Sequence, residues 1–408
     1  MNNLDVEKSY NFIKDFIVPT PCIYSHWLSS ITQAKVYLKL ENFNKTGSFK
    51  DRGVISFLLS NKNNNITHVV AASAGNHAQS VAFFAQKLGI KASIFMPILT
   101  PNNKIMQTKK YQAQVYLQGD NYDEAFMYAQ NFVASNNAHY IHAYNDLSVI
   151  SGQGSVAIEI FNQGIKADLI LVPVGGGGLI SGIASYINDK KLLTKIIGVE
   201  TNKFASMALA LKNNKPCMLQ AQKTIAEGIA VRMVGQLNYD ICSSLNIEMM
   251  SVTDEEIQSS IMFLLEKQKI VAEGAAAASV AALFKLSLEE SLKDKTIVLI
   301  ISGGNIDLGL LNRLSNQELI KTSRLHKFKI LILDTPGSLS NLLRIVSESR
   351  ANIVDVCHER FFANLNWNEV LVEITVEIRD EEHLSILSTT LKENGYQMID
   401  YKDNLCAY

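Results

Sequence analysis

The chain has 408 residues, of which 47% are hydrophobic and 19% charged, and its formal net charge is −1. A chain of this length and ordinary globular composition folds as two or three domains and buries large cores without disulfides. The balance of 38 basic and 39 acidic residues gives no electrostatic reason to expect a nucleic acid or an anionic membrane as a partner.

The cysteines are scattered and odd in number; they are Cys22, Cys217, Cys242, Cys357 and Cys406. No CxxC pair or metal-ligand spacing occurs, so we expect no metal site and a reducing compartment. The first residues are polar or charged and hold no signal-peptide apolar core, which favours a cytoplasmic location. The apolar run 169–187 contains Pro173 and four consecutive glycines, so a buried strand, a tight loop and a helix explain it better than a membrane span.

Helices and strands are expected to alternate along most of the chain. A first helix is expected at 6–17, where apolar residues recur at helical spacing and Pro19 follows. The expected strands are short and apolar: 35–40, 68–72, 92–96, 115–117, 169–174, 196–200 and 296–302. The helices expected between them are 76–88, 101–111, 122–135, 155–163 and 272–286, with a break at 146–154. This alternation predicts an α/β fold with open, mostly parallel sheets covered by helices on both faces.

The pattern changes near residue 323. Four strands are expected at 328–333, 352–359, 370–378 and 397–401, and two helices at 339–349 and 381–394. Their order, βαββαβ, is that of a ferredoxin-like unit, which can bury a core of its own. We therefore expect a C-terminal domain at 326–408 and a larger domain at 1–322, with a smaller subdomain at about 44–150 inside the larger one.

The first motif that carries chemistry is KTGSFKDRG, which surrounds Lys50. Most lysines are solvated surface residues, so Lys50 by itself is uninformative. A Schiff-base lysine, however, needs glycines that let the backbone approach a cofactor, and partial desolvation that frees its amine as nucleophile and base. The run supplies two glycines, two small hydroxyl residues and two further cations. A basic turn before a helix is the alternative interpretation.

Two further motifs follow predicted strands, at the edge where open α/β sheets bind ligands. One is a small-residue turn into a helix, and it comprises Ser73, Ala74, Gly75, Asn76 and His77. The N-terminus of that helix suits a carboxylate, although His77 taken singly is more simply part of a capped helix start. The other motif is Ser302-Gly303-Gly304-Asn305, at the end of the last parallel strand.

A glycine run follows the strand that ends at Val174. Its residues are Gly175, Gly176, Gly177 and Gly178, followed by Leu179. A glycine run between an apolar strand and a helix is typical of a phosphate cradle and not of a linker. It lacks the GxxxxGK[ST] of a nucleotide P-loop, and its match to GxGxxG is weak.

Together, in this order, the four motifs resemble those of the fold type II pyridoxal-phosphate (PLP) enzymes, and within them the threonine/serine dehydratases. The resemblance covers roughly residues 5–320. It implies that the catalytic residue Lys50 holds PLP covalently, that Phe49 packs beside the ring and that Asn76 bonds the ring hydroxyl oxygen. It also implies that the run from Gly175 to Leu179 binds the phosphate, that Ser302 faces the ring nitrogen and that the turn 73–77 binds the substrate carboxylate. The loop Glu227-Gly228 would lie near the ring.

A serine at the ring nitrogen has a chemical consequence, because many PLP enzymes keep that nitrogen protonated with an acidic partner. With Ser302 the ring is a weaker electron sink, so a long-lived carbanion is disfavoured. Loss of the β-hydroxyl together with the α-proton avoids that carbanion, and Lys50 would act as the base. The expected activity is that of a threonine ammonia-lyase, a carbon–nitrogen lyase: L-threonine gives 2-oxobutanoate and ammonia, and L-serine gives pyruvate.

Related functions remain as alternatives. Serine racemases of this family carry a serine where this chain has Ala74, so we expect dehydration without efficient racemisation. Racemase-like members also bind a divalent cation near Glu200, but the later acidic ligand corresponds to Ser206, so no well-formed metal site is expected. Threonine synthase, cysteine synthase and D-amino-acid lyases are further enzyme alternatives. The non-enzyme alternative is an amino-acid-sensing protein with a decayed catalytic domain.

The C-terminal segment from about residue 327 to residue 402 resembles an ACT domain, a module that often senses amino acids. Its ligand-facing turn would comprise Asp334, Pro336, Gly337 and Leu339, where Gly337 frees backbone amides at a helix start. The expected effector is isoleucine or valine, since 2-oxobutanoate feeds isoleucine synthesis. A dimerisation module without a ligand is the alternative. The helical faces suggest a homo-oligomer, either a dimer or a tetramer.

Overall fold

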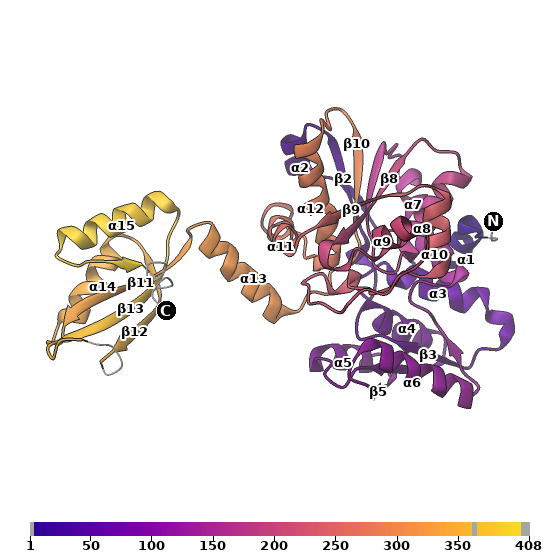
Figure 1. The fold of residues 1–408 in the computed structure, drawn as a ribbon, viewed down its shortest axis with the longest axis horizontal. Helices are drawn as coiled ribbons and strands as arrows, with labels where there is room; N and C mark the ends of the chain where they lie inside the picture. The colour runs from indigo at the N-terminus through magenta and orange to yellow at the C-terminus, as the bar shows by residue number, and fades with distance from the viewer. Residues whose placement is uncertain (1–3, 361–364, 401–408) are drawn as a thin grey trace. The chain divides into compact units, whose positions relative to one another are not determined.

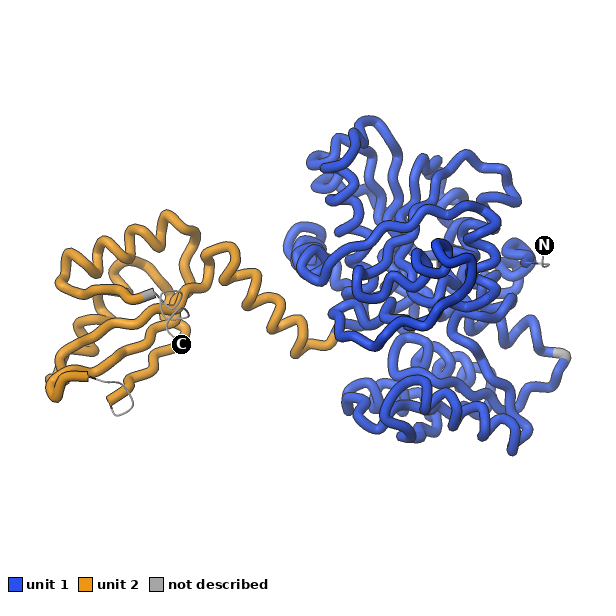
Figure 2. The backbone as a smooth tube through the Cα atoms, viewed as in Figure 1, with its two compact units in different colours: residues 1–306 blue, residues 307–408 orange. Residues whose placement is uncertain are grey.

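The structure, a computed structural model, describes residues 4–360 and 365–400. The expected strand end at Tyr401, the end of the expected C-terminal domain and Cys406 lie outside these residues. The chain divides into two compact units, residues 1–306 and 307–408 (Figure 2). Helix α13 (Leu308–Lys321) begins the second unit, so this division and the boundary expected at 322–326 lie at opposite ends of that helix.

The larger sheet of the first unit has the strand order β1-β2-β10-β7-β8-β9 (Figure 1). Its strands are β1 (Cys22–Tyr24), β2 (Lys35–Leu40), β7 (Leu169–Pro173), β8 (Lys195–Thr201), β9 (Glu248–Val252) and β10 (Thr296–Ile301). Strand β1 pairs antiparallel with β2, and the remaining neighbours pair in parallel. The residues of β7 are all buried, as expected for an apolar strand covered on both faces.

The smaller sheet of the first unit is parallel throughout and has the order β5-β4-β3-β6. Its strands are β3 (His68–Ala72), β4 (Lys91–Met96), β5 (Gln114–Leu117) and β6 (His139–Tyr140). They all fall inside the range 44–150 in which a smaller subdomain was expected. Two mostly parallel sheets with helices between them confirm the α/β architecture that the alternating pattern predicts.

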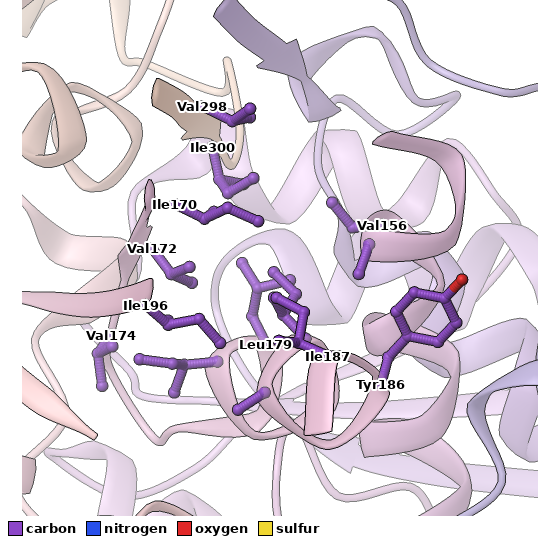
Figure 3. Packing of buried hydrophobic residues seen from close by; sticks show 14 of the residues in the cluster. Val156, Ile170, Val172, Val174, Leu179, Tyr186, Ile187, Ile196, Val298 and Ile300 are labelled. Carbon is purple, nitrogen blue, oxygen red and sulfur yellow. The ribbon is translucent and has the colours of Figure 1, made fainter. Parts of the chain in front are cut away.

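The helices of the first unit are α1 (Val6–Ile13), α2 (His26–Thr32), α3 (Lys50–Ser60), α4 (Asn76–Lys87), α5 (Asn102–Lys109), α6 (Tyr122–Ser135), α7 (Leu147–Asn162), α8 (Gly178–Asp189), α9 (Ser206–Asn213), α10 (Gln236–Ser244), α11 (Asp254–Phe263) and α12 (Gly274–Glu289). Figure 3 shows part of the core between the larger sheet and helices α7 and α8. Ile170, Val172 and Ile300 of the sheet belong to one buried cluster with Val156 of α7 and Leu179 of α8. This core fixes α7 and α8 against the sheet whose strand β7 leads into the glycine run.

The break expected at 146–154 is wrong, because α7 runs through it. The Asp146 side chain accepts a hydrogen bond from the Val149 amide and so begins the helix. Gly152 and Gly154 lie in the expected break, and they serve close packing. A side-chain carbon on Gly152 would lie 2.4 Å from the Arg52 carbonyl oxygen, and one on Gly154 would lie 2.6 Å from that of Gly182. Tertiary contacts therefore override the low helix propensity of glycine.

The second unit contains α13 and an antiparallel sheet of order β12-β13-β11-β14. Its remaining elements are β11 (Leu325–Leu333), α14 (Ser338–Glu348), β12 (Asn352–Glu359), β13 (Glu369–Glu377), α15 (Glu381–Glu393) and β14 (Ile399–Asp400). This is the βαββαβ order expected from the sequence. Phe328, Ile374, Leu342 and Leu387 belong to a separate buried cluster, so this unit has a core of its own. Across the described residues of both units, no helix meets the length and hydropathy of a membrane span.

Candidate active site

Lys50 is the first residue of α3 and is half-buried. Its Nζ donates a hydrogen bond to the carbonyl oxygen of Ala143 at 2.9 Å and lies 5.0 Å from the centre of the Phe49 ring. Burial lowers the pKa of Lys50 from 10.5 to about 8, although the nearby charge of Glu273 opposes this shift. Much of the amine is therefore neutral near pH 8, which a nucleophile or a base requires.

The segment before Lys50 pairs with the residues that follow β10. The Phe49 amide donates to the carbonyl oxygen of Ser302 at 3.0 Å, and Ser48 forms an antiparallel bridge with Gly303. Ser302 is only 2% exposed. Two motifs that lie 250 residues apart in the sequence are thus neighbours in the fold.

Asn76, the first residue of α4, connects these two motifs to a third segment. Its Nδ2 donates to Oε1 of Glu273 at 2.8 Å, and its Oδ1 accepts from Nδ2 of Asn305 at 2.8 Å. Nδ2 of Asn305 also donates to the carbonyl oxygen of Thr46 at 2.7 Å. Burial raises the pKa of Glu273 to about 7, and the hydrogen bond from Asn76 opposes this rise.

The sequence interpretation missed Glu273 as a site residue, and it named Asn305 as part of a motif without giving it a role. Asn305 belongs to the SGGN run, so its position after two glycines was a usable signal. Glu273 precedes an alanine-rich helix, and a lone glutamate there carries no sequence signal. Its place beside Asn76 depends on tertiary contacts alone.

The turn Ser73-Ala74-Gly75 connects β3 to α4 and is half-buried. The Ser73 Oγ accepts from the Gly75 amide at 3.2 Å. A side-chain carbon on Gly75 would meet no atom within 4 Å, so the space beside this turn is open. The first amides of α4 have no acceptor inside the helix and supply donors for an anion, as a carboxylate site requires.

His77 differs from its neighbours because its ring points into the protein. The ring is 3% exposed, and its Nε2 lies 2.9 Å from the carbonyl oxygen of Ile141. A carbonyl oxygen only accepts, so Nε2 carries the hydrogen. Burial and the charge of Lys50 lower the pKa of His77 to about 3, and the ring is neutral at ordinary pH. A substrate contact at His77 would therefore involve its backbone amide.

The glycine run connects β7 to α8 and packs closely against the chain around it. A side-chain carbon on Gly176 would lie 2.2 Å from the Tyr144 ring, and one on Gly178 would lie 2.4 Å from Oε1 of Gln153. Gly177 has a φ of +94°, which favours glycine. The amides that begin α8, including that of Leu179, have no acceptor inside the helix and are available to an anion.

Lys50 and the glycine run both contact the dipeptide Ala143-Tyr144. The Ala143 carbonyl binds Nζ of Lys50, and the next residue, Tyr144, contacts Gly176. A desolvated amine therefore lies close to a helix N-terminus with free amides, at the carboxyl ends of parallel strands. The amine fits an aldehyde, and the amides fit a phosphate, so these residues fit a cofactor that carries both groups.

The loop at η4 (Glu227–Ile229) borders this site through its backbone. A side-chain carbon on Gly175 would lie 3.4 Å from the carbonyl oxygen of Gly228, and one on Gly228 would lie 3.3 Å from Oε1 of Glu273. The Glu227 side chain is exposed and forms an ion pair with Lys104 of α5. The structure thus places Gly228, and not the Glu227 carboxylate, against the predicted site.

Glu200 is buried and caps α9. Its carboxylate accepts from the amides of Met207 at 2.6 Å and Ala208 at 3.0 Å, and Ser206 begins the helix. Burial raises the pKa of Glu200 to about 7. Within residues 4–360 and 365–400, no group of three or more His, Cys, Asp or Glu side chains could hold a metal ion. The lack of a divalent site remains a prediction.

The predicted effector turn lies between β11 and α14. Gly337 has a φ of +95°, and a side-chain carbon there would meet no atom within 4 Å. Asp334 forms an ion pair with Arg360 at 2.9 Å, and Pro336 is exposed. Leu339 instead packs against the core of the second unit. Gly337 therefore offers open space, while Leu339 has a structural role.

A family model described as pyridoxal-phosphate dependent enzyme matches residues 13–303. The chain belongs to this family. Membership agrees with the geometry, since pyridoxal-phosphate dependent enzymes require a reactive lysine and a phosphate site, and Lys50 and the glycine run fit these two needs.

Known relatives of this pyridoxal-phosphate dependent enzyme extend the comparison. The L-threonine ammonia-lyase of Thermotoga maritima is 38% identical over 403 residues, which cover 97% of this chain and 98% of the relative. The crystal structure of threonine deaminase isoform 2 from Solanum lycopersicum is 32% identical with a TM-score of 0.70, and the match covers 76% of this chain and 94% of that one. Maize serine racemase is 28% identical with a TM-score of 0.72, over 78% of this chain and 97% of that one. These matches confirm the fold type II architecture.

Proposed function

We propose that this protein is a PLP-dependent threonine ammonia-lyase that converts L-threonine to 2-oxobutanoate and ammonia, and L-serine to pyruvate and ammonia. The observation that carries the proposal is the meeting of Lys50, Asn76, Ser302 and the glycine run where the carboxyl ends of strands from the two sheets come together. The chain is also 38% identical, over nearly its whole length, to a protein named L-threonine ammonia-lyase.

The residues that would hold the cofactor are those that surround this meeting point of the two sheets. Lys50 would bind its aldehyde carbon, and the amides of Gly175, Gly176, Gly177, Gly178 and Leu179 would bind its phosphate. Phe49 would pack beside the ring, Asn76 would donate to the ring oxygen, and Ser302 would face the ring nitrogen. Bound PLP supplies an electron sink that makes the hydrogen on the substrate Cα acidic.

The protein's own groups then select and deprotonate the substrate. The turn Ser73-Ala74-Gly75, with the amides of Asn76 and His77, would bind the substrate carboxylate, because open space lies beside the first amides of α4, which have no acceptor inside the helix. Lys50 would remove the Cα proton, since its lowered pKa of about 8 leaves the amine able to accept a proton near neutrality. The hydroxyl on Cβ leaves as water, and later hydrolysis returns one water, so the net products are one 2-oxoacid and one ammonia.

Ala74 decides between elimination and racemisation. Racemisation needs a second group that returns a proton on the face opposite to Lys50, and the methyl side chain of Ala74 has no proton to give. We therefore expect that L-serine gives pyruvate without appreciable D-serine. Rapid formation of D-serine would contradict this assignment and favour a racemase.

Turnover of L-threonine tests the proposal directly. Mixing the PLP-loaded protein with L-threonine should release 2-oxobutanoate and ammonia in equal amounts. A Lys50→Ala variant of unchanged fold should release neither. No 2-oxoacid from L-threonine or L-serine would favour an amino-acid-sensing protein without catalytic activity.

We also propose that the second unit is an ACT-like domain that senses isoleucine or valine at the turn Asp334 to Leu339. The open space at Gly337 and the separate core of this unit support that role.

A homo-oligomer, either a dimer or a tetramer, is supported by Trp27 and Ile31 of α2, both 53% exposed. The free thiols of Cys22, Cys217, Cys242 and Cys357 are consistent with a cytoplasmic protein.

A further inference from the structure

The side-chain amide of Asn76 is held in one orientation by partners on both sides. Its oxygen accepts from Asn305, and its nitrogen donates to Glu273. Turning the amide over would place the nitrogen of Asn76 against the nitrogen of Asn305 and the oxygen of Asn76 against a carboxylate oxygen. Both new contacts would be repulsive, so these two neighbours determine which way the amide points.

The direction of this chain of hydrogen bonds is set by the backbone. The carbonyl oxygen of Thr46 can only accept, so the group of Asn305 that faces it must be Nδ2, at 2.7 Å. The second hydrogen on that nitrogen is donated to Asn76 at 2.8 Å. Asn305 therefore donates in both directions, to Thr46 and to Asn76, and Asn76 in turn donates to Glu273, which ends the chain as an acceptor.

Glu273 can come this close because it faces a glycine. A side-chain carbon on Gly303 would lie 2.5 Å from Oε1 of Glu273 and 3.2 Å from Nδ2 of Asn76. The amide of Glu273 also donates to the carbonyl oxygen of Gly303 at 3.1 Å, which fixes the residue just before α12. The charges of Lys50, Lys104 and Glu227 are near enough to act on its carboxylate.

The nitrogen of Asn76 carries two hydrogens, and only one of them is donated to Glu273. We propose that Glu273 is a positioning residue for the cofactor, which holds the Asn76 amide so that its second N–H can donate to the ring oxygen of bound PLP. This inference rests on the proposed role of Asn76 in cofactor binding. Glu273 would not touch the reacting atoms and would act through Asn76.

Two substitutions of Glu273 separate the hydrogen bond from the charge. Glu273→Gln keeps an oxygen that can accept from Asn76, whereas Glu273→Ala leaves the Asn76 nitrogen without that acceptor. Loss of a hydrogen bond to a charged group corresponds to about a ten- to hundredfold change in an equilibrium constant. We expect Glu273→Ala to weaken PLP binding by about that factor, and Glu273→Gln to bind within about threefold of the unmodified protein.

The measurement is the equilibrium binding of PLP to the full-length apo-protein, followed by protein fluorescence, with circular dichroism to show that each variant is folded. In an Asn76→Ala background, Glu273→Ala should weaken binding by less than about twofold, because the residue through which it acts is gone. The same loss of affinity with and without Asn76 would overturn the proposal, since it would show a role independent of Asn76. Unchanged affinity in Glu273→Ala alone would also overturn it.

Asn305→Asp provides a second variant at the other end of the chain, in case Glu273→Ala does not fold. It replaces the two donors of Asn305 with acceptors that face two carbonyl oxygens, so we expect PLP binding to weaken at least tenfold at pH 8. Binding equal to that of the unmodified protein would contradict the role of Asn305 as a donor to both Thr46 and Asn76. Failure of the unmodified protein to bind PLP would instead overturn the proposed function, so the two failures are distinguishable.

Discussion

Lys50 shows how one residue acquires a chemical role from its surroundings. Burial against Phe49 and the segment around Ala143 disfavours the charged amine, and the lowered pKa of about 8 follows from that loss of solvation. The negative charge of Glu273 opposes the shift. The amine is thereby kept reactive near neutral pH by its burial, and its Nζ is hydrogen-bonded to the Ala143 carbonyl oxygen.

Lys50 in the apo-protein should react with an amine-acylating reagent at a lower pH than surface lysines. We expect half-maximal labelling at about pH 8, against about pH 10.4 for a solvated lysine. The negative charge of Glu273 raises the pKa of Lys50, so Glu273→Gln should move the midpoint further down. Peptide mapping of the labelled protein measures both values, and a midpoint near pH 10 would contradict the burial argument.

Helix α3, which begins at Lys50, is anchored by a group of four buried charges. Arg52 lies 2.6 Å from Glu41 of η1 (Glu41–Phe43) and 2.7 Å from Glu159 of α7, and Lys39 of β2 lies 2.6 Å from Glu159. All four side chains are at most 2% exposed. Two cations and two carboxylates balance, so this group ties four elements together two residues away from Lys50.

Arg52→Met should leave two buried carboxylates with a single cation. We expect the free energy of unfolding to fall by about 3–5 kcal/mol, because a buried charge loses its partner. Urea denaturation followed by circular dichroism measures this loss. The matched control is Arg344→Met, which removes an exposed ion pair with Glu348 and should cost no more than about 1 kcal/mol. Equal losses in the two variants would refute the anchoring role.

The elements also show what the sequence could and could not predict. The strands at 169–174 and 296–302 were expected because short, continuous apolar runs between turns are typical of buried parallel strands. Helix α7 was expected too short, because a break was expected at 146–154, where Gly152 and Gly154 instead allow close packing against α3 and α8. Glu273 was missed because its place beside Asn76 depends on contacts between residues 197 positions apart.

At the scale of the whole molecule, the two units have separate cores. The family match covers residues 13–303 and so lies within the first unit. The residues proposed for catalysis lie in the same unit. Catalysis should therefore need only the first unit. Control by an amino acid, if the second unit is ACT-like, should need both.

Truncation after Thr322 tests this division of roles. The shortened protein should keep the deamination of L-threonine and lose any response to isoleucine or valine, because the turn at Gly337 is removed. Steady-state kinetics over a wide titration of each effector would measure this, with the full-length protein as the control. Full-length kinetics that neither effector changes would contradict the sensing role for those two amino acids and favour a dimerisation module.

The central claim, that Lys50 holds PLP, is tested most directly by borohydride reduction of the PLP-loaded protein followed by peptide mapping. Reduction fixes the cofactor to the lysine that holds it. We predict that the reduced cofactor is found on the peptide containing Lys50 and that Lys50→Ala gives no labelled peptide. A reduced cofactor on any other lysine would contradict the account.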